Sequence, residues 1–301
     1  MENHYNDLAQ HIRKQINMHV ALHSAPLGFF KSKPPYPNSE LLRLVQKAAA
    51  LGFKCFQIGP LWNFPKIEAK ELKRALDRCG LEANVHVGGI YDAVKFATTE
   101  KEYVRVKNEI HAGIELCRAI SSGLVSIHPP FFTTRKPEDR TVSSNARSRF
   151  FELVSRELEA ASKMRIKLAL ESFCYPPFIF NGLRDFMRFV SRFSSNELGV
   201  LLETGHLFNA GFDVDEAISM FKRVLFDVHI HDAKVREDFA EATHLPLRLG
   251  DMDFAHLIKQ LQGVSYDGWL TLEIDGNEKQ IMENRLFLES LLKKTRENRT
   301  S

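Results

Sequence analysis

Short runs of apolar and β-branched residues alternate with longer amphipathic segments along the whole chain. In the longer segments apolar residues recur at helical spacing, as Leu41, Leu44, Val45 and Ala48 do. We expect strands at Ile16–His23, Lys54–Ile58, Glu82–Val87, Leu124–His128, Ile166–Glu171, Leu198–Glu203, Val224–His231 and Trp269–Ile274. The expected helices are Ser39–Leu51, Ile67–Cys79, Lys101–Ser121, Ser144–Met164, Gly182–Phe193, Val214–Phe221, Phe254–Gln262 and Glu278–Lys293.

Eight strands that alternate with eight helices indicate an α/β fold with parallel pairing, because antiparallel neighbours would be joined by short turns. The 301 residues divide into units of roughly 38, a size typical of a (β/α)8 barrel. The competing fold, a doubly wound open sheet, usually has a glycine-rich first turn. Here the first strand is followed by Ser24-Ala-Pro-Leu-Gly. We therefore predict a single (β/α)8 TIM barrel over residues 16–293, with a polar arm at 1–15 and a polar tail at 294–301.

The composition is that of a globular protein, with 44% hydrophobic and 26% charged residues. No run approaches the ~18 apolar residues of a membrane span, and the polar N-terminus lacks an apolar signal core. We therefore expect a cytoplasmic protein that does not bind membranes. Its four cysteines form no Cys-x-x-Cys pair, which indicates reduced thiols. The net charge of +3 neither requires nor excludes a polyanionic partner.

Polar side chains stand at the ends of six predicted strands, where a barrel brings all carboxyl ends to one mouth. They are His86, His128, Glu171, Glu203, His229 and Glu273. Any one of these residues alone could serve only to form a hydrogen bond or to cap a helix. Buried carboxylates close to one another, however, repel unless a cation compensates their charge. Mixed oxygen and nitrogen ligands suit Mn²⁺, Co²⁺, Zn²⁺, Fe²⁺ or Mg²⁺. His19, His23 and His231 are given no role, because strand alternation allows them to face away.

In their order and spacing these motifs resemble the xylose-isomerase-like TIM-barrel superfamily. They include Ile127-His128-Pro129, Leu170-Glu171-Ser172, Glu203-Thr-Gly-His206, Val228-His229-Ile-His-Asp232, His244-Leu-Pro-Leu and Leu270-Thr-Leu-Glu273. Resemblance to the sugar epimerase branch implies one divalent metal held by Glu171, Glu203, His229 and Glu273. It also implies that Glu171 and Glu273 are the acid/base pair. This branch usually has Asp at the position of Glu203.

The endonuclease-IV-like branch of the same superfamily, which acts on abasic DNA, has a trinuclear zinc site with additional histidines. His86, His128, His206 and His244 match that pattern. The family's Asp two residues before the last histidine is replaced by Ala242, and we expect that only Glu241 could compensate. This departure weakens the match to a third metal site.

The leading hypothesis is a metal-dependent isomerase or epimerase of a small sugar, keto-sugar or polyol, working by proton abstraction and return through an enediolate. His206 and Lys234 are candidates for orienting substrate hydroxyls, and Asp232 for supporting a ligand histidine. One alternative is a metal-dependent phosphodiesterase acting on abasic DNA, the only reading that involves nucleic acid. Another is an inactive barrel that serves as a binding subunit.

Aromatic residues follow several predicted strands and would surround the mouth. They include Phe29-Phe30, Trp62, Phe64, Phe131-Phe132, Phe178 and Phe180. Stacking on a sugar, for which Trp62 and Phe131 are the candidates, and packing in a homo-oligomer interface both fit. For the DNA alternative, the same loops offer the basic residues Arg135, Lys136 and Arg140.

Overall fold

Eight parallel strands close into a barrel in which each strand pairs with its sequence neighbours and β8 pairs with β1. The computed structural model describes residues 18–25, 35–64, 66–132, 140–172, 179–235 and 242–297. The strands are β1 (His19–His23), β2 (Cys55–Ile58), β3 (Glu82–His86), β4 (Leu124–Ile127), β5 (Lys167–Glu171), β6 (Leu198–Glu203), β7 (Leu225–Ile230) and β8 (Trp269–Leu272). The predicted (β/α)8 TIM barrel is confirmed.

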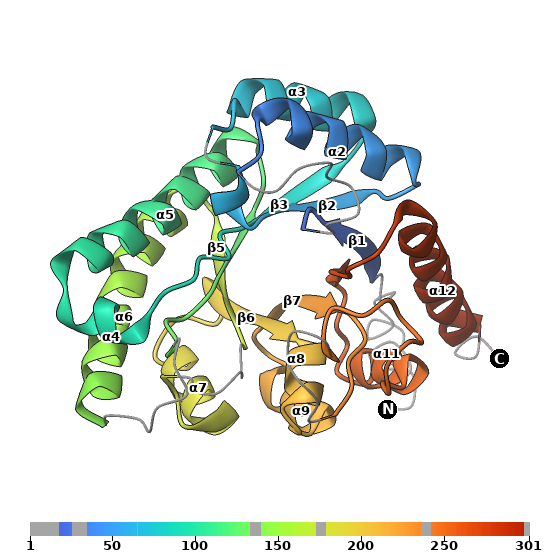
Figure 1. Ribbon diagram of the computed structural model, residues 1–301. Helices are drawn as coiled ribbons and strands as arrows, with labels where there is room; N and C mark the ends of the chain where they lie inside the picture. Colours follow the sequence, from blue (N-terminus) through green and yellow to red (C-terminus); the bar gives the residue numbers. More distant parts are fainter. Residues whose placement is uncertain are drawn as a thin grey trace, which may run out of the picture.

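Helices surround the ring of strands (Figure 1). They are α2 (Asn38–Ala50), η2 (Leu61–Asn63), α3 (Ala69–Cys79), α4 (Ala93–Thr98), α5 (Glu100–Ala119), α6 (Arg140–Lys163), α7 (Gly182–Val190), α8 (Thr204–Asn209), α9 (Val214–Phe221), α11 (Phe254–Gly263) and α12 (Glu278–Glu297). No helix in the described part of the chain is long and apolar enough to cross a membrane.

Local sequence sets the helix boundaries. The Thr99 hydroxyl accepts a hydrogen bond from the Glu102 amide and so caps the start of α5, directly after the end of α4. The Asp213 carboxylate caps the start of α9 in the same way. Gly80 ends α3 with a φ of 62°, a conformation that glycine adopts without strain. Helix α12 continues to Glu297, so part of the segment expected as a tail is helical.

The main hydrophobic core lies where the strands meet the surrounding helices. Most of the aromatic residues belong to this core or pack against it. Phe64, Phe132 and Phe180 are buried in it. The rings of these three residues are therefore covered by protein and present no open face for stacking. Phe29, Phe30 and Phe178 lie outside the described residues.

Candidate functional site

Each strand carries one polar residue at or just beyond its carboxyl end, and side-chain contacts show that these residues meet inside the mouth of the barrel. In strand order they are His23, Gln57, His86, His128, Glu171, Glu203, His229 and Glu273. Alternation along each strand gives them a common inward direction. Six of the eight are the strand-end residues predicted from sequence, and the structure brings all six together.

One group, which we call the central group, consists of Glu203, His229 and Glu273. The Nδ1 atom of His229 lies 2.7 Å from Oε2 of Glu203 and 2.7 Å from Oε2 of Glu273. Despite these distances, His229 Nδ1 and Glu203 Oε2 are buried without a partner in hydrogen-bonding geometry. Lone pairs that converge in this way are the arrangement a divalent cation needs, so the residues fit a metal ion.

A second group consists of His86, His128 and Glu171. Oε2 of Glu171 lies 3.2 Å from Nε2 of His86 and 2.7 Å from Nε2 of His128. Nδ1 of His128 is 3.2 Å from the carbonyl oxygen of Gly89, an acceptor that favours a proton on that nitrogen. Nε2 of His128 then presents its lone pair to the group, which is the usual state of a metal-binding histidine.

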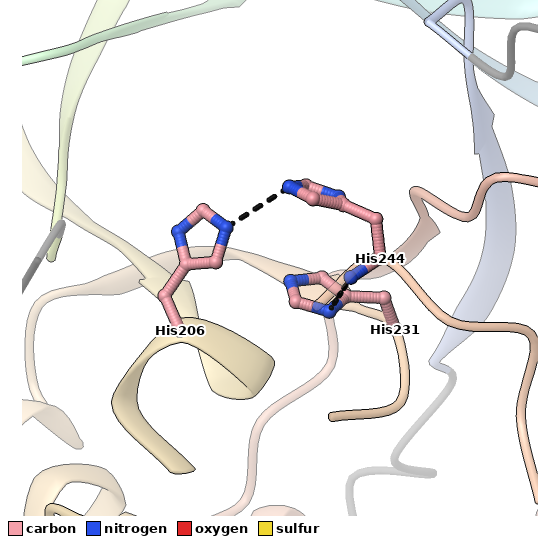
Figure 2. A group of neighbouring side chains, drawn as sticks. All are labelled: His206, His231 and His244. Atoms are coloured by element: carbon pink, nitrogen blue, oxygen red, sulfur yellow. Dashed lines mark hydrogen bonds between the residues drawn. The ribbon is translucent and has the colours of Figure 1, made fainter. Parts of the chain in front are cut away.

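Three further histidines, His206, His231 and His244, meet beside Glu203 (Figure 2). Nε2 of His206 and Nε2 of His244 are 3.0 Å apart, and Nε2 of His231 lies 2.6 Å from Oε1 of Glu203. The carbonyl oxygen of Glu273 lies 3.2 Å from Nδ1 of His244. Glu171 and Glu203 also form a group with His206, so these two carboxylates link the three ligand groups already described.

Two histidines that were given no role in the sequence are part of the site. His231 contacts Glu203, and Nε2 of His23 lies 3.0 Å from Nδ1 of His86. His231 stands two positions after His229, and side chains two positions apart along a strand face the same side. Strand alternation therefore places His231 on the side of His229 instead of turning it away from the site. His19 lies at the opposite end of β1 and is exposed. Gln57, which contacts His229, was not among the residues predicted from the sequence.

Burial and charge act against each other in the site. Burial raises the pKa of Glu203, but the charges of His206 and His229 outweigh it and hold this pKa below its usual value. Burial lowers the pKa of His229, but the charges of Glu273 and Glu203 outweigh it and hold this pKa well above its usual value. In the metal-free protein the positive charge of protonated His229 therefore compensates the negative charges of Glu203 and Glu273. A bound cation would take the place of the proton on His229.

The other residues predicted to contact the substrate or a ligand belong to none of the ligand groups. Trp62 is 48% exposed and lines an outer groove of about 740 Å³ between η2, α3 and α5. Phe131 packs against the core and bridges Asp92, and Lys234 is half-buried just beyond β7. The Asp232 carboxylate accepts hydrogen bonds from backbone amides of residues 233, 250 and 252. It is the carbonyl oxygen of Asp232, 3.2 Å from Nδ1 of His231, that contacts a ligand histidine.

Several sequence predictions fall on residues outside the described ranges. They concern Arg135, Lys136 and Glu241. Ala242, which stands where the endonuclease-like pattern has Asp, is buried.

Comparison with known proteins finds relatives in sequence and in fold. An inosose dehydratase of Clostridium botulinum is 24% identical over 286 residues, covering 86% of this chain and 91% of that protein. A solved D-tagatose 3-epimerase-like protein superimposes with a TM-score of 0.74 at 21% identity, covering 93% of this chain and 99% of the other. An AP endonuclease of family 2 from Brucella melitensis gives a TM-score of 0.66 at 16% identity, with 88% and 97% covered.

These structural similarities concern the fold. The family model that describes the xylose isomerase-like TIM barrel matches residues 45–291, most of the chain and nearly all of the strands that form the site. The chain belongs to the xylose isomerase-like TIM barrel family.

Proposed function

We propose that this protein is a divalent-metal-dependent isomerase or epimerase of a small sugar, keto-sugar or polyol. The observation that carries the proposal is the convergence of Glu203, His229 and Glu273 on one point, with Glu171 in the adjoining group. The similarity to an inosose dehydratase and to a D-tagatose 3-epimerase-like protein supports the choice of substrate class.

Glu171, Glu203, His229 and Glu273 would hold the cation. When bound, it would polarise neighbouring carbonyl and hydroxyl oxygens of the substrate and make the C–H between them more acidic. The donor set of three carboxylates and one imidazole fits Mn²⁺, Co²⁺, Mg²⁺ or Zn²⁺.

Glu171 and Glu273 are the acid/base pair in this proposal. They extend from β5 and from the end of β8, so they approach a substrate in the mouth from different sides. Burial raises the pKa of each, but neighbouring histidines outweigh burial and lower it, so both are ionised and able to accept a proton. One would remove the proton as an ionised base, and the other, after taking up a proton from solvent, would give it to the opposite face or to the neighbouring carbon.

The test is exchange of substrate hydrogen with solvent. Protein loaded with Mn²⁺ is incubated with a panel of ketoses and inososes in D₂O, and deuterium incorporation is followed by NMR. Glu171→Gln should abolish exchange, whereas Glu157→Gln, which changes a glutamate paired with His111 on the outer helices, should retain it. Absence of metal-dependent exchange with every substrate would contradict the proposal.

A second candidate, a metal-dependent phosphodiesterase acting on abasic DNA, is favoured by one observation: Glu171, Glu203 and His206 link the central group to two further ligand groups. Two or three cations could then activate water and stabilise the leaving oxygen. Metal analysis of the purified protein separates the candidates, because one ion per chain supports the epimerase and three support the nuclease. Nicking of an abasic duplex, with an intact duplex as control, tests the second activity directly.

A further inference from the structure

Beneath the candidate metal ligands lies a second layer of buried polar side chains. Gln57 on β2, Asp227 on β7 and Thr271 on β8 are all fully buried. They form one connected set with His229: Nε2 of His229 is 2.6 Å from Oε1 of Gln57, and Nε2 of Gln57 donates to Oδ2 of Asp227 at 2.7 Å. The second oxygen of Asp227 accepts from the Thr271 hydroxyl at 3.0 Å and from the Val228 amide at 2.8 Å.

The direction of these hydrogen bonds is determined by the carboxylate at their end. Both oxygens of Asp227 face donors, so the group of Gln57 that faces it must be the NH₂. The carbonyl oxygen of Gln57 then points at His229, and as an acceptor it requires a proton on Nε2. In a neutral imidazole with a proton on Nε2, the lone pair is on Nδ1. Nδ1 is the atom that lies 2.7 Å from Glu203 and from Glu273.

We propose that Gln57, Asp227 and Thr271 are positioning residues that hold His229 in the one neutral form able to bind a metal through Nδ1. The inference rests on the proposed metal-dependent function, because it concerns the same site. If the Gln57 amide were reversed, its oxygen would face the Asp227 carboxylate and its NH₂ would face Nε2 of His229. The proton would then move to Nδ1, and the central ligand group would lose its nitrogen donor.

A structural argument supports a role beyond packing. A buried carboxylate without a charged partner is costly, and the three hydrogen bonds to Asp227 only reduce this cost. An apolar side chain would fill the same space with less penalty. The burial of Asp227 is explained if its charge orients the Gln57 amide. The Gln57 amide in turn determines which nitrogen of the His229 ring carries the proton.

The test compares metal binding by the full-length variants Gln57→Met, Thr271→Val and Ser126→Ala. Gln57→Met keeps the length of the side chain but cannot orient His229, and Thr271→Val removes one of the hydrogen bonds to Asp227. Ser126→Ala is the matched control, because Ser126 is fully buried on β4 and its hydroxyl makes no hydrogen bond within the described residues. The dissociation constant for Mn²⁺ is measured by titration calorimetry, and circular dichroism verifies that each variant is folded.

We expect Gln57→Met to weaken Mn²⁺ binding by about 10–100-fold, Thr271→Val to weaken it less, and Ser126→Ala to leave it within about two-fold of wild type. A second readout reports on the ring itself. In Zn²⁺-loaded protein labelled with ¹⁵N-histidine, the His229 signal, identified by its loss in His229→Gln, should show a proton on Nε2. This pattern should be lost in Gln57→Met.

The outcomes are distinguishable. Equal Mn²⁺ affinity in Gln57→Met and Ser126→Ala, or a proton on Nδ1 of His229 in the wild type, would overturn the inference and leave the metal site standing. Absence of binding of any divalent cation to the wild type would overturn the proposed function and the inference with it. Should Gln57→Met not fold, Thr271→Val decides the question, because weakened binding in that variant supports the inference and unchanged binding overturns it.

Discussion

Gly205, the second residue of α8, packs directly against the ring of His231. Alanine usually stabilises a helix relative to glycine, but we expect Gly205→Ala to destabilise this protein. A Cβ atom on Gly205 would lie 2.1 Å from Cε1 and 2.2 Å from Nδ1 of His231. The ring of His231 is fully buried and is held by Glu203 at 2.6 Å. Both atoms belong to a rigid ring in a packed environment, so the methyl group fits only if the ring is displaced.

The magnitude follows from three contributions. Alanine is favoured over glycine in a helix by about 1 kcal/mol. Forcing an extra carbon into a packed interior costs about 1–3 kcal/mol, and losing a hydrogen bond between His231 and the Glu203 carboxylate costs about 1.5–3 kcal/mol. We therefore expect Gly205→Ala to lower the free energy of unfolding by about 1.5–5 kcal/mol. With an unfolding entropy of about 0.6 kcal/mol/K for a chain of 301 residues, Tm should fall by about 2–8 °C.

The assay is thermal and urea denaturation of the metal-free wild type, Gly205→Ala and Gly263→Ala. Gly263 is the matched control, because it also lies in a helix, α11, and a Cβ there meets no atom within 4 Å. Gly263→Ala should be neutral or stabilising by up to about 1 kcal/mol. The double variant Gly205→Ala/His231→Ala provides space for the methyl group, so its destabilisation should be smaller than the sum of the two single effects.

Two results would refute this reasoning. One is a Gly205→Ala protein as stable as Gly263→Ala, which would mean that His231 moves without cost. The other is strict additivity in the double variant, which would mean that the methyl group and the ring do not compete for the same space.

Two further predictions concern buried ionisable groups. In the metal-free protein burial lowers the pKa values of His23 and His206 to about 3 and raises the pKa of Asp227 to about 6. Burial also lowers the pKa of His86. Unfolding between pH 6 and 4.5 then takes up at least two protons and releases one, so urea denaturation should show a loss of at least about 1.4 kcal/mol per pH unit as the pH falls. Burial also raises the pKa of the Cys55 thiol to about 12 and that of Cys117 to about 11. Neither should be alkylated at pH 8 in the folded protein, and both should be alkylated in urea, as followed by peptide mass spectrometry.

Each of these two predictions has its own control. His23→Gln removes one of the titrating histidines and should flatten the pH dependence, while stability that rises as the pH falls from 6 to 4.5 would contradict the pKa values of His23 and His206. For the thiols, half-buried Cys79 provides the comparison, and alkylation of Cys55 as fast as that of Cys79 would show that burial does not protect it.

The fold was predictable because hydrophobic periodicity reports directly on which face of an element is buried. Leu198–Glu203 and Val214–Phe221 were predicted with the bounds that the structure has. The six-residue helices α4 and α8 were not, because one or two turns carry too little periodicity to be distinguished from a loop. Strand ends were placed to within one to three residues, which is why the strand-end ligands could be grouped at the mouth.

The candidate site was predictable only in part. Charged residues that end apolar strands stand out in a sequence, and they led to Glu171, Glu203 and Glu273. His231 and Gln57 do not stand out, because their importance depends on which side chain of another strand they face. Gln57 and His229 are 172 positions apart and are brought together only by the closed barrel.

Closure of the barrel has a consequence for when the site comes into being during folding. The side chains of the mouth are contributed one at a time along the chain, from His23 on the first strand to Glu273 after the last, and β8 completes the ring by pairing with β1. A nascent chain that has not yet released its final strand lacks a carboxylate of the central group. If the protein binds a cation as proposed, uptake would therefore be a late event in biogenesis, and a tightly held ion would report that the barrel has closed.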